Sequence, residues 1–330
     1  MFLWTPAVPA AESCPDWPEV FRMNRAETGS GKKVLIFSFQ NKDGAPEDEW
    51  LTDSFRYLLA DYFSFSKKLT VLNIPDVQAA QPVETKEALD LSKNRGADYL
   101  LYGFFKRDLV KGTLTVFVRF TDVQKNKELG RAQWEMEYPK TEKIFDLYIE
   151  VADQAFQFFA GKKNEKKRLL PFRHESRSVV SFQDYILARR LVETGEPQNI
   201  ETAVRLFGEA LQNDYNYAPA YLGRAEALLM HAYVAKTEGK AHRALVRDAE
   251  KDLTKASLLH PAFTEKMQGT IQNYLKADPH QVAGLALAQE NNKKAQNEFK
   301  KGLSFLPGDV LALRYLGESK KLKTLDPCLP

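Results

Sequence analysis

The chain has 330 residues, of which 44% are hydrophobic and 12% aromatic, which excludes a disordered chain and allows two domains of ordinary size. The charge is unevenly placed: residues 1–160 hold 20 Lys and Arg against 24 Asp and Glu, and residues 161–330 hold 27 against 20. The resulting net charges of −4 and +7 are much smaller than those typical of nucleic-acid-binding domains. The positive charge of the C-terminal half slightly favours an acidic partner for it.

Residues 1–31 predict an irregular arm, because four prolines and a Gly-Ser-Gly run interrupt them. Phe2-Leu3-Trp4 and the cleavage pattern of Val8 and Ala10 resemble the end of a secretory signal, but a basic region and a full apolar core are missing. Either the start lies further upstream or the segment is an ordinary leader. We expect a periplasmic or envelope-associated protein, with a cytoplasmic one as the alternative, and no transmembrane helix.

The two cysteines lie near the ends of the chain, at Cys14 and Cys328. Because no C-x-x-C pair exists, a zinc ribbon or a thioredoxin-type site is excluded. Three interpretations stay open: a disulfide between the tails, two unrelated thiols, or lipid attachment at Cys14, which Glu12 disfavours.

Residues 32–160 predict an α+β domain. Val34 to Phe39 form a nearly continuous apolar run, which is typical of a strand covered on both faces. We expect strands at 32–40, 69–72, 98–107, 113–123 and 128–138, and helices at 47–65, 84–94 and 143–160. This order predicts a sandwich in which helices pack on a mixed sheet.

Several phrases of this domain resemble one protein family. They are Val34-Leu35-Ile36-Phe37-Ser38-Phe39-Gln40-Asn41, Trp50-Leu51-Thr52-Asp53-Ser54, Gly96-Ala97-Asp98-Tyr99-Leu100-Leu101-Tyr102-Gly103 and Phe120-Thr121-Asp122-Val123. With the order of elements, they resemble the TolB amino-terminal-like domain, which is related in fold to domains of curli-secretion and flagellar envelope lipoproteins. The resemblance implies an envelope protein or the sensory end of a regulator, with helices of the tetratricopeptide (TPR) type following.

Residues 161–180 are predicted to link the two domains. The linker carries a short basic run, Lys162, Lys163, Lys166, Lys167 and Arg168. We expect this run to be solvated, with contact to anionic lipid or nucleic acid as the alternative.

Residues 181–322 predict an all-α domain built on a repeated pattern. Ala203, Phe207, Ala210 and Tyr215 recur 46 residues later as Ala249, Leu253, Ala256 and Pro261, and again as Ala295, Phe299, Gly302 and Pro307. The first three positions share one helix face, where small residues admit a neighbouring helix and the bulky residue fills the gap. This resembles the second helix of a TPR repeat, although the period exceeds the usual TPR length of about 34 residues.

Three helix pairs are expected in this domain, at 182–193 with 199–213, at 218–235 with 241–259, and at 281–290 with 293–306. An extra helix at 263–276 is expected to end at Asp278-Pro279. A capping helix at 309–321 precedes the tail, residues 323–330.

The sequence offers no convincing catalytic set. The five histidines, His174, His231, His242, His260 and His280, form no metal-binding spacing, and no phosphate loop or nucleophile elbow is found. We therefore expect no enzyme activity, cofactor or metal. Glu47 to Glu49 are interpreted as complementing a helix dipole, and Phe104 to Arg107 as core and solvated edge instead of a base-stacking platform.

The binding surface is expected on the first helices of the pairs, which line the concave groove of a TPR array. The candidates are Tyr185, Arg189, Tyr221, Arg224, Leu228, Gln289 and Asn292. Arg and Tyr suit carboxylates and extended peptides, while the alternative is that the tyrosines pack between helices. The sequence predicts a non-enzymatic scaffold or adaptor of a bacterial envelope assembly (secretion, motility or outer membrane) that binds protein and no nucleic acid. A sensory module that binds a small ligand is the alternative.

Overall fold

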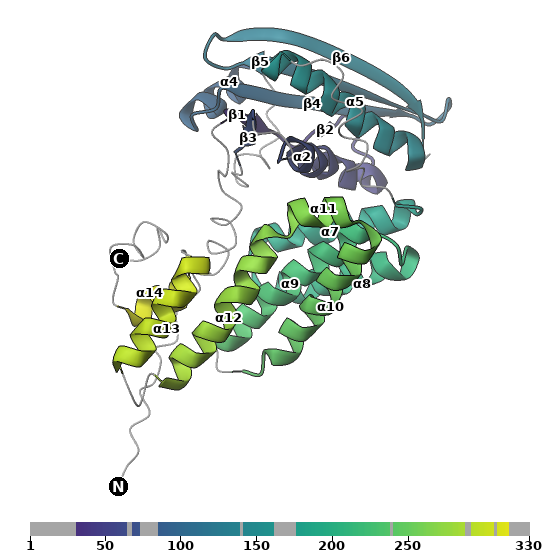
Figure 1. Ribbon diagram of the computed structural model, residues 1–330. Helices are drawn as coiled ribbons and strands as arrows, with labels where there is room; N and C mark the ends of the chain where they lie inside the picture. Colours follow the sequence, from purple (N-terminus) through teal and green to yellow (C-terminus); the bar gives the residue numbers. More distant parts are fainter. Residues whose placement is uncertain are drawn as a thin grey trace.

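The computed structural model describes residues 31–64, 68–72, 85–138, 141–161, 176–237, 240–287, 292–306 and 309–316 (Figure 1). An α+β half is followed by an all-helical half, as the sequence predicted. Residues 1–30 of the predicted arm, both cysteines, the basic run of the linker, Gln289 and the tail lie outside the described residues.

The α+β half is a mixed sheet with helices on it. Its strands are β1 Lys32–Ile36, β2 Gln40–Asn41, β3 Leu69–Val71, β4 Tyr99–Asp108, β5 Thr113–Asp122 and β6 Lys127–Glu137, and its helices are η1 Pro46–Asp48, α2 Glu49–Ser64, α4 Thr85–Asn94 and α5 Thr141–Ala160. The strand order is β3-β1-β4-β5-β6, and β2 pairs with β4. β1 is parallel to β3 and β4, whereas β4, β5 and β6 form an antiparallel meander, so the predicted mixed sheet is confirmed.

The apolar run at β1 is buried on both faces of the sheet. Val34 and Ile36 belong to the core that includes α2 and α5, whereas Leu35 and Phe37 belong to a second cluster beneath α4. The run is not one strand, however. Between β1 and β2 the amide of Phe39 donates to the carbonyl of Thr52 in α2 (2.9 Å), because the chain turns toward the helix there.

Gly103, in the middle of β4, has no room for a side chain. A Cβ there would lie 2.2 Å from the carbonyl oxygen of Phe117 on β5. Gly103→Ala is expected to lower the free energy of unfolding by about 1–3 kcal/mol, because the two strands must move apart. Urea denaturation measures this, with Gly269→Ala as the control, since a Cβ at Gly269 meets nothing within 4 Å. Equal stabilities for the two variants would contradict the close approach of β4 and β5.

Between residues 176 and 316, the described part of the helical half contains three packed helix pairs and two short helices. Its elements are α7 Val179–Thr194, α8 Pro197–Asn213, α9 Ala218–Thr237, α10 Arg243–Leu259, α11 Pro261–Met267, α12 Gly269–Leu287, α13 Asn292–Phe305 and α14 Val310–Tyr315. α7 packs with α8, α9 with α10, and α12 with α13, and Figure 1 shows the pairs following one another away from the α+β half. The predicted pairing is confirmed for the first two pairs.

The repeated pattern of small and bulky residues forms the internal packing of these pairs. All three copies of its first three positions, on α8, α10 and α13, are buried. Phe207 packs on Gly223 of α9, where a Cβ would fall 2.4 Å from the ring, and Phe299 packs in the same way on Gly284 of α12. The pattern therefore holds helices together, and the residues in it are not available to a partner.

The predicted break at Asp278-Pro279 is wrong. α12 runs from Gly269 to Leu287 with Pro279 inside it, and the break falls earlier, between α11 and α12 at Gln268. A proline inside a helix removes one backbone hydrogen bond and usually ends or kinks the helix. Here tertiary contacts hold both sides, because Lys236 of α9 bonds to Asp278 before the proline and to Gln281 after it. The third pair therefore begins well before Gln281.

His260 gives the start of α11 a dependence on pH. Its Nδ1 accepts a hydrogen bond from the amide of Phe263 (3.3 Å), and burial lowers the pKa of the ring below its usual value. A protonated ring cannot accept this bond. Because the unfolded chain binds the proton more readily, the stabilisation is present above the unfolded pKa of about 6.5 and is lost as the pH falls toward the folded pKa.

We expect His260→Asn to weaken the loss of stability between pH 7 and pH 5, because asparagine caps a helix without titrating. Urea denaturation of both proteins at the two pH values tests this. The same pH dependence in the variant as in the wild type would contradict the role of the ring nitrogen.

Candidate functional site

The predicted groove residues lie on three helices and differ in exposure. Tyr185 and Arg189 are on α7, Tyr221, Arg224 and Leu228 are on α9, and Asn292 is the first residue of α13. Tyr185 and Leu228 are buried, whereas Tyr221 is partly exposed. Asn292 is thus on the second helix of its pair, where a first helix was expected.

Arg189 of α7 contacts α2 of the α+β half. Its Nη1 donates to Asp61 Oδ2 at 2.6 Å and to the hydroxyl of Tyr185 at 3.1 Å, and the guanidinium lies 4.6 Å from the centre of the Tyr57 ring. Burial by itself would lower the pKa of Arg189, but the Asp61 carboxylate raises it well above its usual value. Arg189 is therefore charged, and its contact with Asp61 is largely removed from water.

A second ion pair joins the same two helices. Arg56 of α2 donates from both terminal nitrogens to the Glu193 carboxylate of α7, at 3.0 and 2.6 Å. The Tyr57 hydroxyl donates to the same carboxylate at 2.8 Å. A bidentate ion pair of this kind fixes the orientation of the two side chains as well as the distance between them. Asp53 also lies 3.5 Å from Arg56 and 3.7 Å from Arg190, so it extends the cluster along α2.

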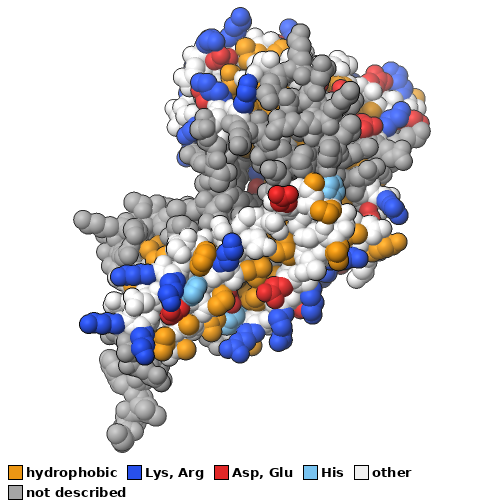
Figure 2. Space-filling model, in the orientation of Figure 1, with side chains coloured by type: hydrophobic (Ala, Val, Ile, Leu, Met, Phe, Trp, Pro, Cys, Tyr) orange, Lys and Arg blue, Asp and Glu red, His pale blue; other side chains and the backbone are white. Residues whose placement is uncertain are grey.

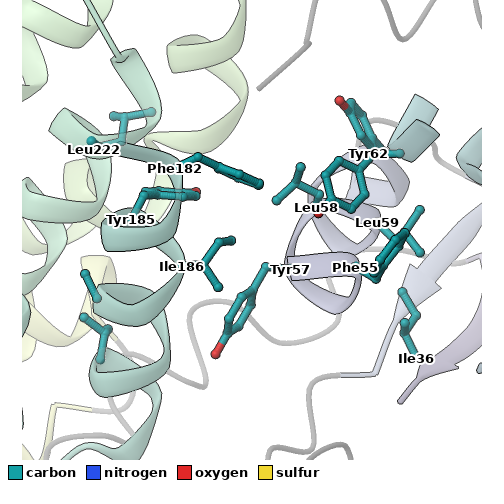
Figure 3. Packing of buried hydrophobic residues seen from close by; sticks show 14 of the residues in the cluster. Ile36, Phe55, Tyr57, Leu58, Leu59, Tyr62, Phe182, Tyr185, Ile186 and Leu222 are labelled. Carbon is teal, nitrogen blue, oxygen red and sulfur yellow. The ribbon is translucent and has the colours of Figure 1, made fainter. Parts of the chain in front are cut away.

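Apolar side chains continue the contact between the halves. The Phe182 ring of α7 lies edge to face with Trp50, at 5.4 Å between centroids, and 4.9 Å from Phe145 of α5. Figure 3 shows Phe182, Tyr185 and Ile186 pointing from α7 toward α2. Buried residues of both halves consequently belong to one continuous core.

Tyr185 and Arg189, which were expected to line a concave groove, face the α+β half of the same chain. Arg189 lies in the α2–α7 contact, which we define by Asp53, Arg56, Asp61, Arg189 and Glu193, and the Tyr185 hydroxyl accepts a hydrogen bond from Arg189 beside it. The first helix of the helical half, α7, is therefore covered by the chain's own α+β half. Binding of a partner through these two side chains stays a prediction, and it would require the contact to open.

Arg224 of α9 is also paired within the chain. Its Nε and one terminal nitrogen each donate to the Asp252 carboxylate of α10 at 2.7 Å. Hydrogen bonding to the Asp252 carboxylate raises the pKa of Arg224. The predicted arginine is partly exposed, but its charge is already neutralised by the neighbouring helix of its own pair.

A third polar cluster links α9, α12 and the start of α14. The buried Lys236 bonds to Asp278 and Gln281, and Gln281 donates to Asp309. The Tyr233 hydroxyl also donates to Asp309, at 2.8 Å. Burial lowers the pKa of Lys236 and raises that of Asp309. The cluster attaches the third pair and the last helix to the second pair.

Sequence reasoning missed the α2–α7 contact. The sequence does contain two sets of three polar residues spaced four apart: Asp53, Tyr57 and Asp61 on α2, and Tyr185, Arg189 and Glu193 on α7. Residues four apart lie on the same face of a helix, so each set forms a row of polar side chains on a helix that is otherwise largely apolar. Arg189 on α7 carries a charge opposite to those of Asp53 and Asp61 on α2, and this complementarity could have suggested a contact.

Neither a family model nor a curated protein matches the chain. Several solved structures are similar to parts of it, and three of them illustrate the likeness. TolB from Acinetobacter baumannii is 17% identical with a TM-score of 0.31, and the match covers 41% of this chain and 30% of that one. The LpoB C-terminal domain from Salmonella enterica is 18% identical with a TM-score of 0.27, covering 37% and 96%. A PelC dodecamer from Paraburkholderia phytofirmans is 14% identical with a TM-score of 0.26, covering 40% and 89%.

Two further findings concern the described part of the chain. None of its helices combines the length and hydropathy that crossing a membrane requires. Its His, Cys, Asp and Glu side chains form no group of three or more that could hold a metal ion.

Proposed function

We propose that the chain is a non-enzymatic adaptor that holds protein partners at a fixed relative position, one on the α+β half and one on the helical half. The α2–α7 contact carries this proposal. It combines two buried ion pairs with an aromatic junction, so the halves are expected to move as one body. Interfaces between domains that lack such contacts normally permit relative motion.

The helical half supports the protein-binding part of the proposal. Stacked helix pairs bury a repeated set of residues and expose extended outer surfaces, which TPR-like and other repeat arrays use to bind proteins. The phrases between Val34 and Val123 that resemble the TolB amino-terminal-like domain support a place in a bacterial envelope assembly. We propose TPR-like repeats and a periplasmic or envelope-associated location on these grounds.

Chemical crosslinking of the tagged full chain in its native cell, followed by fractionation, tests the adaptor. We expect discrete protein partners to be crosslinked reproducibly, and the chain to be recovered with the envelope. Recovery without any crosslinked protein would contradict the adaptor. A purely cytosolic chain would contradict the envelope location, even when partners are found.

A further inference from the structure

A line of four cations follows the outer face of α10. Arg243, Arg247, Lys251 and Lys255 are spaced four residues apart and all are exposed. In the described part of the chain, Lys251 bonds to Asp248 (2.8 Å), whereas no ion pair is made by the other three. Figure 2 shows Lys and Arg side chains along the lower edge of the helical half, where Figure 1 places α10. We call these four residues the basic stripe.

The basic stripe is narrow and has acidic edges. At 3.6 residues per turn it lies opposite the buried face of Ala249, Leu253 and Ala256. The exposed carboxylates of Asp248 and Glu250 lie on either side of it. A flat anionic surface such as a bilayer would meet these carboxylates as well as the cations, whereas a single linear chain meets the cations alone. The geometry therefore favours a linear acidic ligand.

An apolar residue continues the stripe at its C-terminal end. Leu258 is 76% exposed and lies on the same face of α10 as Lys251 and Lys255. A segment that carries acidic residues followed by an apolar one would match both features. Neighbouring cations of the stripe are about 6 Å apart along the helix, close to the roughly 6.7 Å between alternate side chains of an extended peptide.

We propose that the basic stripe binds an extended acidic segment of a protein partner, with carboxylates at alternate positions. This inference rests on the proposed function and assigns the surface and the partner chemistry. Arg189 and Arg224, where an acidic partner was first expected, are neutralised by Asp61 and Asp252. The basic stripe instead offers cations on the outer face of the second helix pair. In the described part of the chain only Lys251 of the stripe has an ion-pair partner, so at the other three cations no existing partner has to be displaced by a ligand.

The test uses the purified full chain and a fluorescein-labelled peptide of alternating glutamate and serine, with binding measured by fluorescence anisotropy at about 50 mM salt. Arg247→Glu/Lys255→Glu reverses two charges of the stripe. Lys293→Glu/Lys300→Glu on α13 is the matched control, because it changes the net charge equally on exposed residues of another outer helix. We expect about tenfold or greater weakening in the stripe variant and less than twofold in the control, and weaker binding in higher salt.

The assignment would be overturned if the wild type does not bind the peptide, or if both variants weaken binding equally. It would also be overturned if the stripe binds phosphatidylcholine–phosphatidylglycerol vesicles or oligothymidylate but does not bind the peptide. The native-cell crosslinking separates the stripe from the adaptor. If the stripe variant still crosslinks the same partners to the same extent, the stripe assignment fails and the adaptor stands. If the wild type crosslinks no protein, the adaptor fails, and the peptide measurement decides the stripe independently.

Discussion

Replacing Arg189 by alanine is expected to lower the free energy of unfolding by about 3–5 kcal/mol, because the buried Asp61 carboxylate would lose its ion pair with the Arg189 guanidinium. The two side chains are only 16% and 6% exposed, so solvent screens the pair weakly. The variant also loses the hydrogen bond to Tyr185 and the contact with the Tyr57 ring. Urea denaturation of the full chain measures the change.

The chain supplies a matched control for this substitution. Arg205 and Glu209 on α8 are also 2.6 Å apart, but their side chains are 62% and 40% exposed. Arg205→Ala should therefore change the free energy of unfolding by less than about 1 kcal/mol. The double variant Arg189→Met/Asp61→Leu should recover most of the lost stability, because it removes both buried charges. Arg189→Ala with an effect as small as that of Arg205→Ala would mean that the α2–α7 contact is not formed.

Phe182→Ala is expected to cost about 3–5 kcal/mol as well, because it removes a fully buried ring from the junction of the halves. The ring contacts Trp50, Phe145 and Tyr148, all in the α+β half. We also expect the single unfolding transition to separate into two, since each half keeps the rest of its own core. Calorimetry and circular dichroism followed during heating measure both effects.

Phe182→Leu is the milder comparison, because it keeps an apolar side chain in the junction and should retain one transition. A single, unshifted transition in Phe182→Ala would show that the ring does not couple the two halves.

The α+β half could be predicted from the sequence because its signals are local. Strand alternation and turn residues such as Gly96 and Gly112, both in the left-handed conformation, marked the elements in their observed order. The apolar run at Val34 to Phe39 indicated burial on both faces, and the sheet provides it. The 46-residue pattern likewise marked buried positions, because small and bulky residues at helical spacing report on packing.

The rest depends on partners far apart in the chain. Arg189 and Asp61 are separated by 128 positions, and Arg56 and Glu193 by 137, so the sequence displays the charges without showing how they pair. For this reason arginines assigned to a partner proved to be paired within the chain. The predicted helix end at Pro279 is wrong for the same reason. Contacts from Lys236 on α9 hold α12 on both sides of the proline, and the sequence does not show them.

The α2–α7 contact is expected to hold the two halves as one body. Spin labels at Lys127→Cys on β6 and Gln212→Cys on α8, in a chain with Cys14→Ser and Cys328→Ser, allow the distance between the halves to be measured by double electron–electron resonance. Both labelled positions are exposed. We predict one narrow distance distribution, which becomes broad when Arg189→Ala is added. A distribution that is broad in both proteins would contradict a rigid adaptor.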